Sequence, residues 1–347
     1  MRARRGRPPL APHPAEGPET VRPRRTFVPC SLTYAAIRSP ALRARLMIHT
    51  SPAVAEALAA FRPVVALEST VLAHGLPRPR NLEVGLAMEE AVASAGAVPA
   101  TIGVVAGVPR VGMGRAEVER LATAEGVLKL STRDLAVPVA RGLDGATTVA
   151  ATMWLAARAG VRVFATGGIG GVHRGADRDV SADLTELGRT PMLVVCAGAK
   201  SVLDLPATRE ALETAGVLVA GWGTDELPAF YSARSGIPVD VRVDDAAQAA
   251  ALWRAHRDLG LPGAMLLCVP PPAEHALRAE EVDDAISAAL DGARREGIRG
   301  KDVTPFLLRA VAEATGGRSL EANVALLLNN ARVAASVAVA VARADGA

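Results

Sequence analysis

The sequence contains little cysteine, few aromatic residues and almost no lysine. Its three cysteines, Cys30, Cys196 and Cys268, are odd in number and show no CxxC spacing. This excludes a complete disulfide framework, argues against a structural zinc site and is typical of a protein of the reducing cytoplasm. Half of the 347 residues are hydrophobic, which excludes general disorder and is enough for one large α/β domain or two small ones.

Lysine is scarce in a way that points to chemistry. Only three of the 39 basic residues are lysines, namely Lys129, Lys200 and Lys301. Arginine therefore serves almost everywhere that a positive charge is enough, whereas only a lysine amine readily loses its proton and becomes a nucleophile. The three lysines are candidates for a catalytic role, and the alternative is that they are chance survivors.

Positive charge is concentrated in residues 1–46, which hold ten arginines, eight prolines and two glutamates. This composition predicts a disordered N-terminal extension without the apolar run of a secretory signal. We interpret it as an over-long gene model or a dispensable tail, with an RNA-binding arm as the alternative. The remainder carries 29 basic and 34 acidic residues, and this acidic balance argues against a nucleic-acid surface on residues 47–347.

From residue 47 onward, short apolar runs typical of buried strands alternate with stretches typical of helices. The expected strands cover 63–67, 99–105, 127–130, 161–165, 192–197, 217–220, 239–243 and 264–269. The expected helices cover 52–60, 81–95, 115–124, 145–159, 182–187, 209–214, 244–258, 279–295, 305–314 and 320–342. The alternation predicts one domain over 47–347 of the α/β class, with a mainly parallel sheet, helices on both faces (α/β/α) and a helical C-terminal part.

The last expected helix is apolar enough over 324–342 to suggest a membrane span. Asn329, Asn330 and Arg332 lie near its centre, however, and an arginine is costly inside a bilayer. A buried helix or a subunit-interface helix is therefore the better interpretation, with no membrane contact. Asn323 and Asn330 lie seven residues apart on this helix, and they bind either a ligand or a neighbouring helix.

Polar residues gather where the expected strands end, which is the edge where open parallel sheets bind ligands. Glu68 follows the strand 63–67, and it is either functional or a salt-bridged core glutamate, because burying an unpaired carboxylate is costly. The glycines of 167–171 follow the strand 161–165 and predict backbone amides open to a phosphate. Lys200 stands three residues after the strand 192–197.

Further candidates surround these three features. Lys129 within an apolar strand must reach an anion or a pocket, with Arg174 as another cation near the site, and Ser181 is placed to cap the helix 182–187. His74 either lines the site or is satisfied by backbone. The glycines do not satisfy the dinucleotide fingerprint, and the chain has no P-loop, GxSxG or HExxH motif.

These ingredients fit imine chemistry on a sugar phosphate. A neutral Lys200 amine attacks a carbonyl carbon and forms a Schiff base, an electron sink that lets a neighbouring carbon–carbon bond break. Glu68 moves protons, and the glycine amides and Lys129 hold the phosphate. A Mg²⁺ or Mn²⁺ ion needs few protein carboxylates, which Asp179 or Asp183 would supply.

From about Ala53 to Ala342, the chain resembles the pseudouridine-5′-phosphate glycosidases, also called pseudouridylate lyases. The segments that carry the resemblance are VVALESTVLAHG (64–75), GAVPATI (96–102), KLSTRDL (129–135), GATTV (145–149), FATGGIGGVHRGA (164–176), DVSADL (179–184), VVCAGAKS (194–201) and TPFLL (304–308).

The resemblance implies a lyase that reversibly cleaves the C–C glycosidic bond of pseudouridine 5′-phosphate to uracil and D-ribose 5-phosphate, in pseudouridine catabolism. It implies Mn²⁺ as cofactor and a homotrimer of α/β/α subunits. Carried over by motif, the site residues are Lys200 (Schiff base), Glu68 (proton donor), Asp179 (metal), and Lys129, Val149, Ser181, Ala182, Asp183, Thr166, His173 and Asn323 (substrate).

One departure from the family concerns the loop between Ala176 and Asp179, which is often longer in these enzymes; the shorter loop bears on metal affinity and loop closure. Two other functions remain as alternatives. The first is a Schiff-base aldolase acting on another pentose phosphate. The second is an RNA-binding protein that uses the basic arm of residues 1–46.

Overall fold

The computed structural model describes residues 48–174, 179–298 and 303–345. All of them belong to one compact unit, Ala44–Ala347. The predicted N-terminal extension, the loop residues 176–178 and Lys301 lie outside the described residues.

The unit is built on an eleven-stranded sheet, and seven of its strands run parallel in the order β3-β2-β7-β8-β11-β9-β10. β4 and β6 both pair with β3 in the antiparallel sense. The strands are β1 His49–Thr50, β2 Val64–Leu67, β3 Val98–Val105, β4 Val108–Val111, β5 Leu128–Leu130, β6 Gly145–Thr147, β7 Val163–Ala165, β8 Leu193–Cys196, β9 Leu218–Trp222, β10 Val241–Val243 and β11 Met265–Cys268. The predicted mainly parallel sheet is confirmed.

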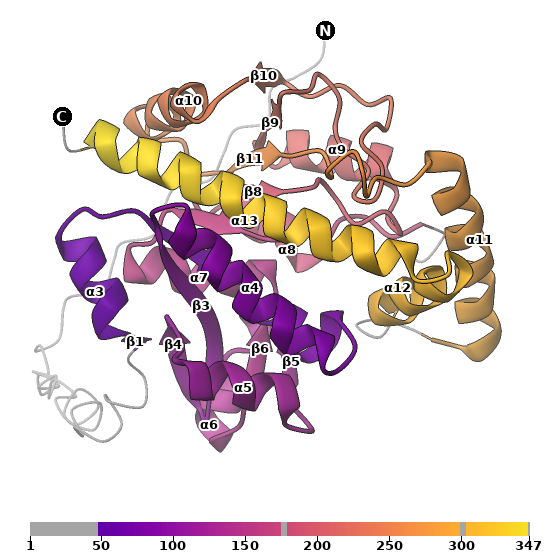
Figure 1. Cartoon of the computed structure of the whole chain (residues 1–347), viewed down its shortest axis with the longest axis horizontal. Helices are drawn as coiled ribbons and strands as arrows, with labels where there is room; N and C mark the ends of the chain where they lie inside the picture. Colours follow the sequence, from indigo (N-terminus) through magenta and orange to yellow (C-terminus); the bar gives the residue numbers. More distant parts are fainter. Residues whose placement is uncertain (1–47, 175–178, 299–302, 346–347) are drawn as a thin grey trace, which may run out of the picture. The chain divides into compact units, whose positions relative to one another are not determined.

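Helices cover both faces of the sheet, with α4, α10 and α13 in front of the strands and α7, α8 and α9 behind them in the view of Figure 1. The α-helices are α3 Pro52–Ala59, α4 Arg80–Ser94, α5 Arg115–Thr123, α6 Ala136–Arg141, α7 Val149–Ala159, α8 Ala182–Leu187, α9 Leu205–Thr214, α10 Ala246–Asp258, α11 Ala279–Glu296, α12 Val303–Ala314 and α13 Arg318–Asp345. Because both faces are covered, every residue of β2, β8 and β11 is buried, as the unbroken apolar runs predict.

Three strands differ from the expected elements, and one of them is the two-residue strand β1, which was not expected. Gly145–Thr147 forms β6 between β5 and β3, whereas we expected it to open the helix that begins at Val149. A side chain at Gly145 would collide with Leu130, so close packing explains the glycine. The short strand β4 was not expected; it follows a turn at Ala106 and Gly107, both with positive φ, that reverses the chain after β3.

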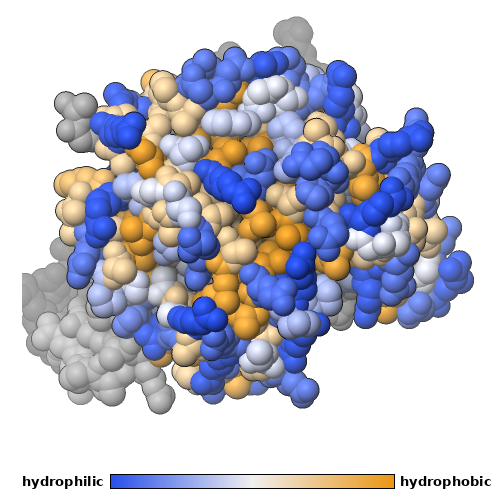
Figure 2. Space-filling model, in the orientation of Figure 1, coloured by the Kyte–Doolittle hydropathy of each residue, from blue (hydrophilic) through white to orange (hydrophobic). Residues whose placement is uncertain are grey.

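α13 is long and apolar enough to cross a membrane by length and composition alone, but 56% of its most apolar window is buried. It packs against β2, β7 and β8 and against α4 and α10. This agrees with the predicted buried helix, because the sheet accounts for much of its apolar surface. Figure 2 shows a further apolar patch on this face, over α4 and α13, where Ala87, Ala91 and Leu328 line a groove.

The turn after β8 generates a testable prediction about stability. Gly198 has φ +83°, and a Cβ atom there would collide with the carbonyl oxygen of Pro228. Since a strained backbone residue alone costs about 1–3 kcal/mol, we expect Gly198→Ala to lower the free energy of unfolding by about 3 kcal/mol. Urea denaturation followed by circular dichroism measures the loss.

Gly126 provides the matched control, because it also has a positive φ (+71°) but has nothing within 4 Å of its Cβ position. Gly126→Ala is expected to cost only about 1–2 kcal/mol, the penalty of the left-handed backbone itself. Equal losses for the two variants would show that the close approach of Pro228 is not a constraint on this turn.

Candidate active site

Strand ends and helix starts surround a cavity of about 310 Å³. Nine of the eleven site residues expected from the sequence line it, namely Glu68, Lys129, Val149, His173, Asp179, Ser181, Ala182, Asp183 and Lys200. They come from the ends of β2 and β8, from β5, from the starts of α7 and α8, and from the loop after β7. The cavity therefore lies at the carboxyl edge of the sheet, where a ligand site was expected.

Glu68 follows β2 and is only 8% exposed. Its carboxylate accepts hydrogen bonds from the hydroxyls of Thr70 and Thr166. No ion pair of Glu68 occurs among the described residues, so the alternative of a salt-bridged core glutamate does not hold there. Its carboxylate is held by neutral donors and lines the same cavity as Lys200.

The end of β2 is also fixed from the neighbouring strands. The backbone amide of Thr147 in β6 donates to the hydroxyl of Ser69 at 2.9 Å. The Thr147 hydroxyl donates in turn to the carbonyl of Ile102 in β3 at 2.8 Å and accepts from Thr152 at 2.8 Å. This buried network connects Ser69, the residue after Glu68, with the first turn of α7. It therefore fixes the positions of these two walls of the cavity relative to each other.

Lys200 lies against the glycine turn that follows β7. Its backbone amide donates to the carbonyl of Ile169 at 3.1 Å, and its side-chain Nζ donates to the carbonyl of Gly168 at 2.7 Å. The side chain is partly buried and lines the cavity with Glu68. An amine and a carboxylate therefore line one cavity, the pairing that imine chemistry requires.

The glycine turn differs from the expected phosphate cradle. The Gly170 amide donates to Asp183 at 2.8 Å, and the Ile169 amide donates to the carbonyl of Gly198 at 3.1 Å, so neither is available to a ligand. Close packing explains the glycines instead. A Cβ atom at Gly170 or Gly171 would collide with Ser181 or Thr208, respectively.

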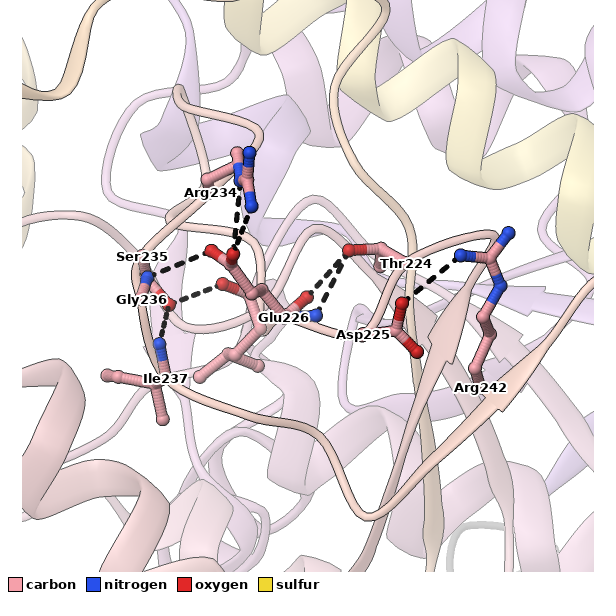
Figure 3. Close-up of polar contacts among 9 residues, drawn as sticks. Thr224, Asp225, Glu226, Arg234, Ser235, Gly236, Ile237 and Arg242 are labelled. Atoms are coloured by element: carbon pink, nitrogen blue, oxygen red, sulfur yellow. Dashed lines mark hydrogen bonds and ion pairs between the residues drawn. The ribbon is translucent and has the colours of Figure 1, made fainter.

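A loop over residues 224–237 packs against this turn through Phe230. A Cβ atom at Gly168 would lie 2.7 Å from the Phe230 ring. The loop is held by Glu226, which accepts from Arg234 at 2.6 Å and from the amide of Gly236 at 3.0 Å (Figure 3). The hydrogen bonds from Arg234, followed by that from Gly236, lower the pKa of Glu226, so the contacts persist at neutral pH.

Asp183 is 5% exposed and connects two walls of the cavity. One carboxylate oxygen accepts from the Ala150 amide at the start of α7 at 2.9 Å, and the other accepts from the Gly170 amide. A carboxylate at a helix N-terminus is favourable because the dipole and the open amides there attract negative charge. Ser181 caps α8 as predicted, since its hydroxyl accepts from the Asp183 amide at 3.2 Å.

His173 and Asp179 lie across the loop from each other. The His173 amide donates to the Asp179 carbonyl at 2.9 Å. Burial is the main cause that lowers the pKa of the His173 imidazole; Asp179 opposes this shift, and Lys129 and Lys200 add to it. A neutral imidazole near pH 7 offers one donor and one acceptor to a ligand.

Other cavity residues were missed by sequence reasoning. The hydroxyl oxygens of Ser131 and Thr148 are buried and have no hydrogen-bond partner within the described ranges. Both lie in segments whose resemblance we quoted, KLSTRDL and GATTV, but no role was assigned to them. Arg133 adds a second cation beside Lys129, and Leu203, Pro305 and Leu308 form an apolar side.

Four expected or suggested residues lie elsewhere. Thr166 is fully buried behind Glu68, and Asn323 does not line the cavity. Asn330 donates to the backbone carbonyls of Thr166 and Gly167 after β7, so its partner is the segment after a strand and not the neighbouring helix of the structural alternative. Arg174 was expected near the amine, but it donates to the carbonyls of Ser201 and Leu203 and pairs with Asp283 in α11; it does not line this cavity.

Few metal ligands meet at the cavity. Within residues 48–174, 179–298 and 303–345, no three His, Cys, Asp or Glu side chains are grouped to hold a metal ion. Of the two carboxylates expected as ligands, Asp183 already accepts backbone hydrogen bonds with both oxygens, which leaves Asp179. This donor set fits only an ion that keeps most of its water ligands, as Mg²⁺-like ions do.

The family model described as "Indigoidine synthase A like protein" matches residues 53–340. The chain belongs to this family. Among curated relatives, a pseudouridine-5′-phosphate glycosidase of Chloroflexus aurantiacus is 59% identical over 299 residues, which are 84% of this chain and 98% of the relative. Another of the same name, from Herpetosiphon aurantiacus, is 60% identical over 292 residues, 84% of this chain and 96% of the relative.

Solved structures of the family share the fold. The prealnumycin C-glycosynthase AlnA, crystallised in complex with ribulose 5-phosphate, is 44% identical with a TM-score of 0.80, over 87% of this chain and 99% of AlnA. An indigoidine synthase A-like protein from Thermotoga maritima is 36% identical with a TM-score of 0.79, over 86% and 98%. The α/β fold is therefore that of this enzyme family.

The electrostatics of the cavity can be tested through His173. Because the positive charge of Lys129 lowers the His173 pKa, Lys129→Met is expected to raise it toward the usual histidine value of about 6.5. NMR titration of the His173 imidazole carbons, in the presence of a chelator, measures the shift. Arg133→Met is the control, because this exposed cation lines the cavity without contributing to the His173 pKa; an unchanged value in Lys129→Met would contradict the account.

Proposed function

We propose that the chain cleaves the C–C glycosidic bond of pseudouridine 5′-phosphate to uracil and D-ribose 5-phosphate, and that it also runs the reverse reaction. The placement of the Lys200 amine and the Glu68 carboxylate in one cavity carries this proposal. The curated relatives, similar over nearly their whole length, support the substrate. The complex of the related C-glycosynthase with a pentose phosphate supports the class of ligand.

Lys200 is the nucleophile of the proposed reaction. Its uncharged amine forms a bond to C1′ of the ribose while the C1′–O4′ bond breaks, and a proton passes from the nitrogen to O4′, which opens the ring and restores the nitrogen lone pair. The nitrogen lone pair then forms the C1′ iminium as the C1′–C5 bond breaks, and C5 of the leaving uracil takes a proton. Water hydrolyses the iminium, which releases ribose 5-phosphate and the free lysine.

Glu68 is the proton donor in this scheme. It lies at the end of β2 beside the cavity, and the Thr70 and Thr166 hydroxyls orient its carboxyl group. Oriented general acids contribute roughly 10²–10⁴-fold to such steps. Hydroxyls can both donate and accept hydrogen bonds, so Thr70 and Thr166 can orient this carboxyl group in either of its protonation states.

The phosphate is held by different groups from those that the glycine motif suggested. Since the Gly170 amide already donates to Asp183, Lys129 binds the phosphate in this scheme, and Arg133 lines the same cavity. The open hydroxyls of Ser131 and Thr148 add hydrogen-bond donors. Val149, Ala182 and His173 line the rest of the substrate space.

We also infer a Mn²⁺ ion, a homotrimer and a cytoplasmic location. Asp179 would hold the ion with water as its other ligands, and the ion would supply positive charge near the phosphate. The family resemblance supports all three inferences. The apolar groove over α4 and α13 supports an interface between subunits on that face.

The decisive assay is release of uracil from pseudouridine 5′-phosphate by purified protein with Mn²⁺. We expect turnover by the wild type and a loss of at least about 10³-fold in Lys200→Arg, which keeps the charge but removes the nucleophile. Ribose 5-phosphate incubated alone should stay intact. Cleavage of the plain sugar phosphate without uracil release would instead indicate an aldolase and would overturn the proposal.

Removal of the ion tests the proposed metal. Chelation is expected to lower the rate of uracil release, and Asp179→Asn should raise the Mn²⁺ concentration needed for half-maximal rate by about tenfold, since one of few ligands is lost. Asp204→Asn, which changes an N-cap outside the cavity, is the control. Full activity after exhaustive chelation would contradict a role for the metal.

A further inference from the structure

One polar side chain lies at the centre of the apolar helix α13 without reaching the cavity. Asn330 is fully buried. Its amide nitrogen donates to the carbonyl of Thr166 at 2.8 Å and to that of Gly167 at 3.3 Å. Its amide oxygen has no partner among the described residues. A buried polar atom without a hydrogen bond is energetically costly and needs an explanation, and a role in a functional site is one such explanation.

The segment that Asn330 holds touches both proposed catalytic groups. The Thr166 hydroxyl donates to Glu68, and the Gly168 carbonyl accepts from the Lys200 amine at 2.7 Å. Between them, the Gly167 carbonyl accepts from the Ala197 amide at 2.8 Å. Residues 166–168 therefore contact both the acid and the amine.

The sheet order places this segment midway between the two groups. β7, which leads into Thr166, pairs with β2 on one side and with β8 on the other. α13 packs across all three strands, as its course in front of the sheet in Figure 1 shows. The helix comes so close that a Cβ atom at Gly167 would lie 3.1 Å from Leu327. Helix α13 is thus in contact with the backbone of residues 166–168, which lies between Glu68 and Lys200.

We propose that Asn330 is a positioning residue for the reaction, because its amide fixes residues 166–168 and thereby sets the separation of Glu68 and Lys200. The expected effect on kcat rests on the proposed function, whereas the effect on the position of Glu68 relative to Lys200 does not. An apolar residue at position 330 would fill the space yet leave two backbone carbonyls without this donor. The segment would then be free to shift relative to both groups.

Kinetics of Asn330→Ala test the proposal. We expect kcat for uracil release to fall about 10- to 100-fold, because small displacements of reacting groups cost rates of this size, while KM changes less than about threefold. Asn330→Ser, whose hydroxyl can donate to one carbonyl, should recover part of the loss. The pH profile of kcat should shift in Asn330→Ala, since the Glu68 carboxyl group changes its contacts.

A packing variant on the same helix separates positioning from stability. Val337 is also fully buried in α13, so Val337→Ala removes core contacts without removing a donor to residues 166–168. At a matched loss of melting temperature, Val337→Ala should keep the wild-type kcat and pH profile. If Asn330→Ala behaves like Val337→Ala in both readouts, the proposal is overturned. If Asn330→Ala does not fold, the same comparison with Asn330→Ser decides.

A measurement without substrate keeps this inference apart from the proposed function. Reductive methylation with formaldehyde, followed by mass spectrometry, reports the reactivity of Lys200 separately from the other two lysines. We expect Asn330→Ala to change the rate and pH dependence of labelling at Lys200 and to leave Lys129 unchanged. No change at Lys200 would refute the positioning role even in a protein that releases uracil. A change at Lys200 would uphold the geometric role even in a protein that releases none.

Discussion

The proposed chemistry depends on holding a carboxyl group and an amine in one cavity. Glu68 is buried and Lys200 is partly buried, so the fold must supply hydrogen bonds that replace those of water. It does so with neutral partners, which are two threonine hydroxyls for Glu68 and one backbone carbonyl for Lys200. Neutral partners orient the groups without fixing their charge, and proton transfer and amine attack both require a charge that can change.

A parallel sheet makes this arrangement possible because the carboxyl ends of its strands share one edge. β2 and β8 are separated by β7 alone, so the residues that follow them lie within reach of the same ligand. The glycines after β7 let the neighbouring elements approach closely, and Phe230 of the loop 224–237 packs against Gly168 of this turn. The cavity is therefore formed by backbone packing, and side chains supply its chemistry.

Much of this was predictable from sequence for identifiable physical reasons. Strands buried on both faces are continuous apolar runs, and nearly all of the expected strands and helices occur within a few residues of the expected bounds. The ligand edge follows from the strand ends, and the scarcity of lysine drew attention to Lys200. Membership of the family and the α/β fold agree with the resemblance of the quoted segments.

What was not predictable depends on contacts between distant parts of the chain. The Gly170 amide looks open in the sequence, but Asp183 reaches it from α8. Gly145–Thr147 looks like a helix start, but two strands are available to pair with it. Asn330 lies more than 160 positions from Thr166, so no local pattern could connect them. Spacing and composition predict elements and edges, whereas hydrogen-bond partners across the sheet require the folded chain.

The most direct test of the central claim is to trap the covalent intermediate. Borohydride added during turnover of pseudouridine 5′-phosphate reduces an imine to a stable amine, and peptide mass spectrometry then locates the pentose phosphate. The account predicts a single adduct on Lys200, which is easily distinguished because the chain has only two other lysines. Uracil release without any adduct, or an adduct on Lys129 instead, would contradict it.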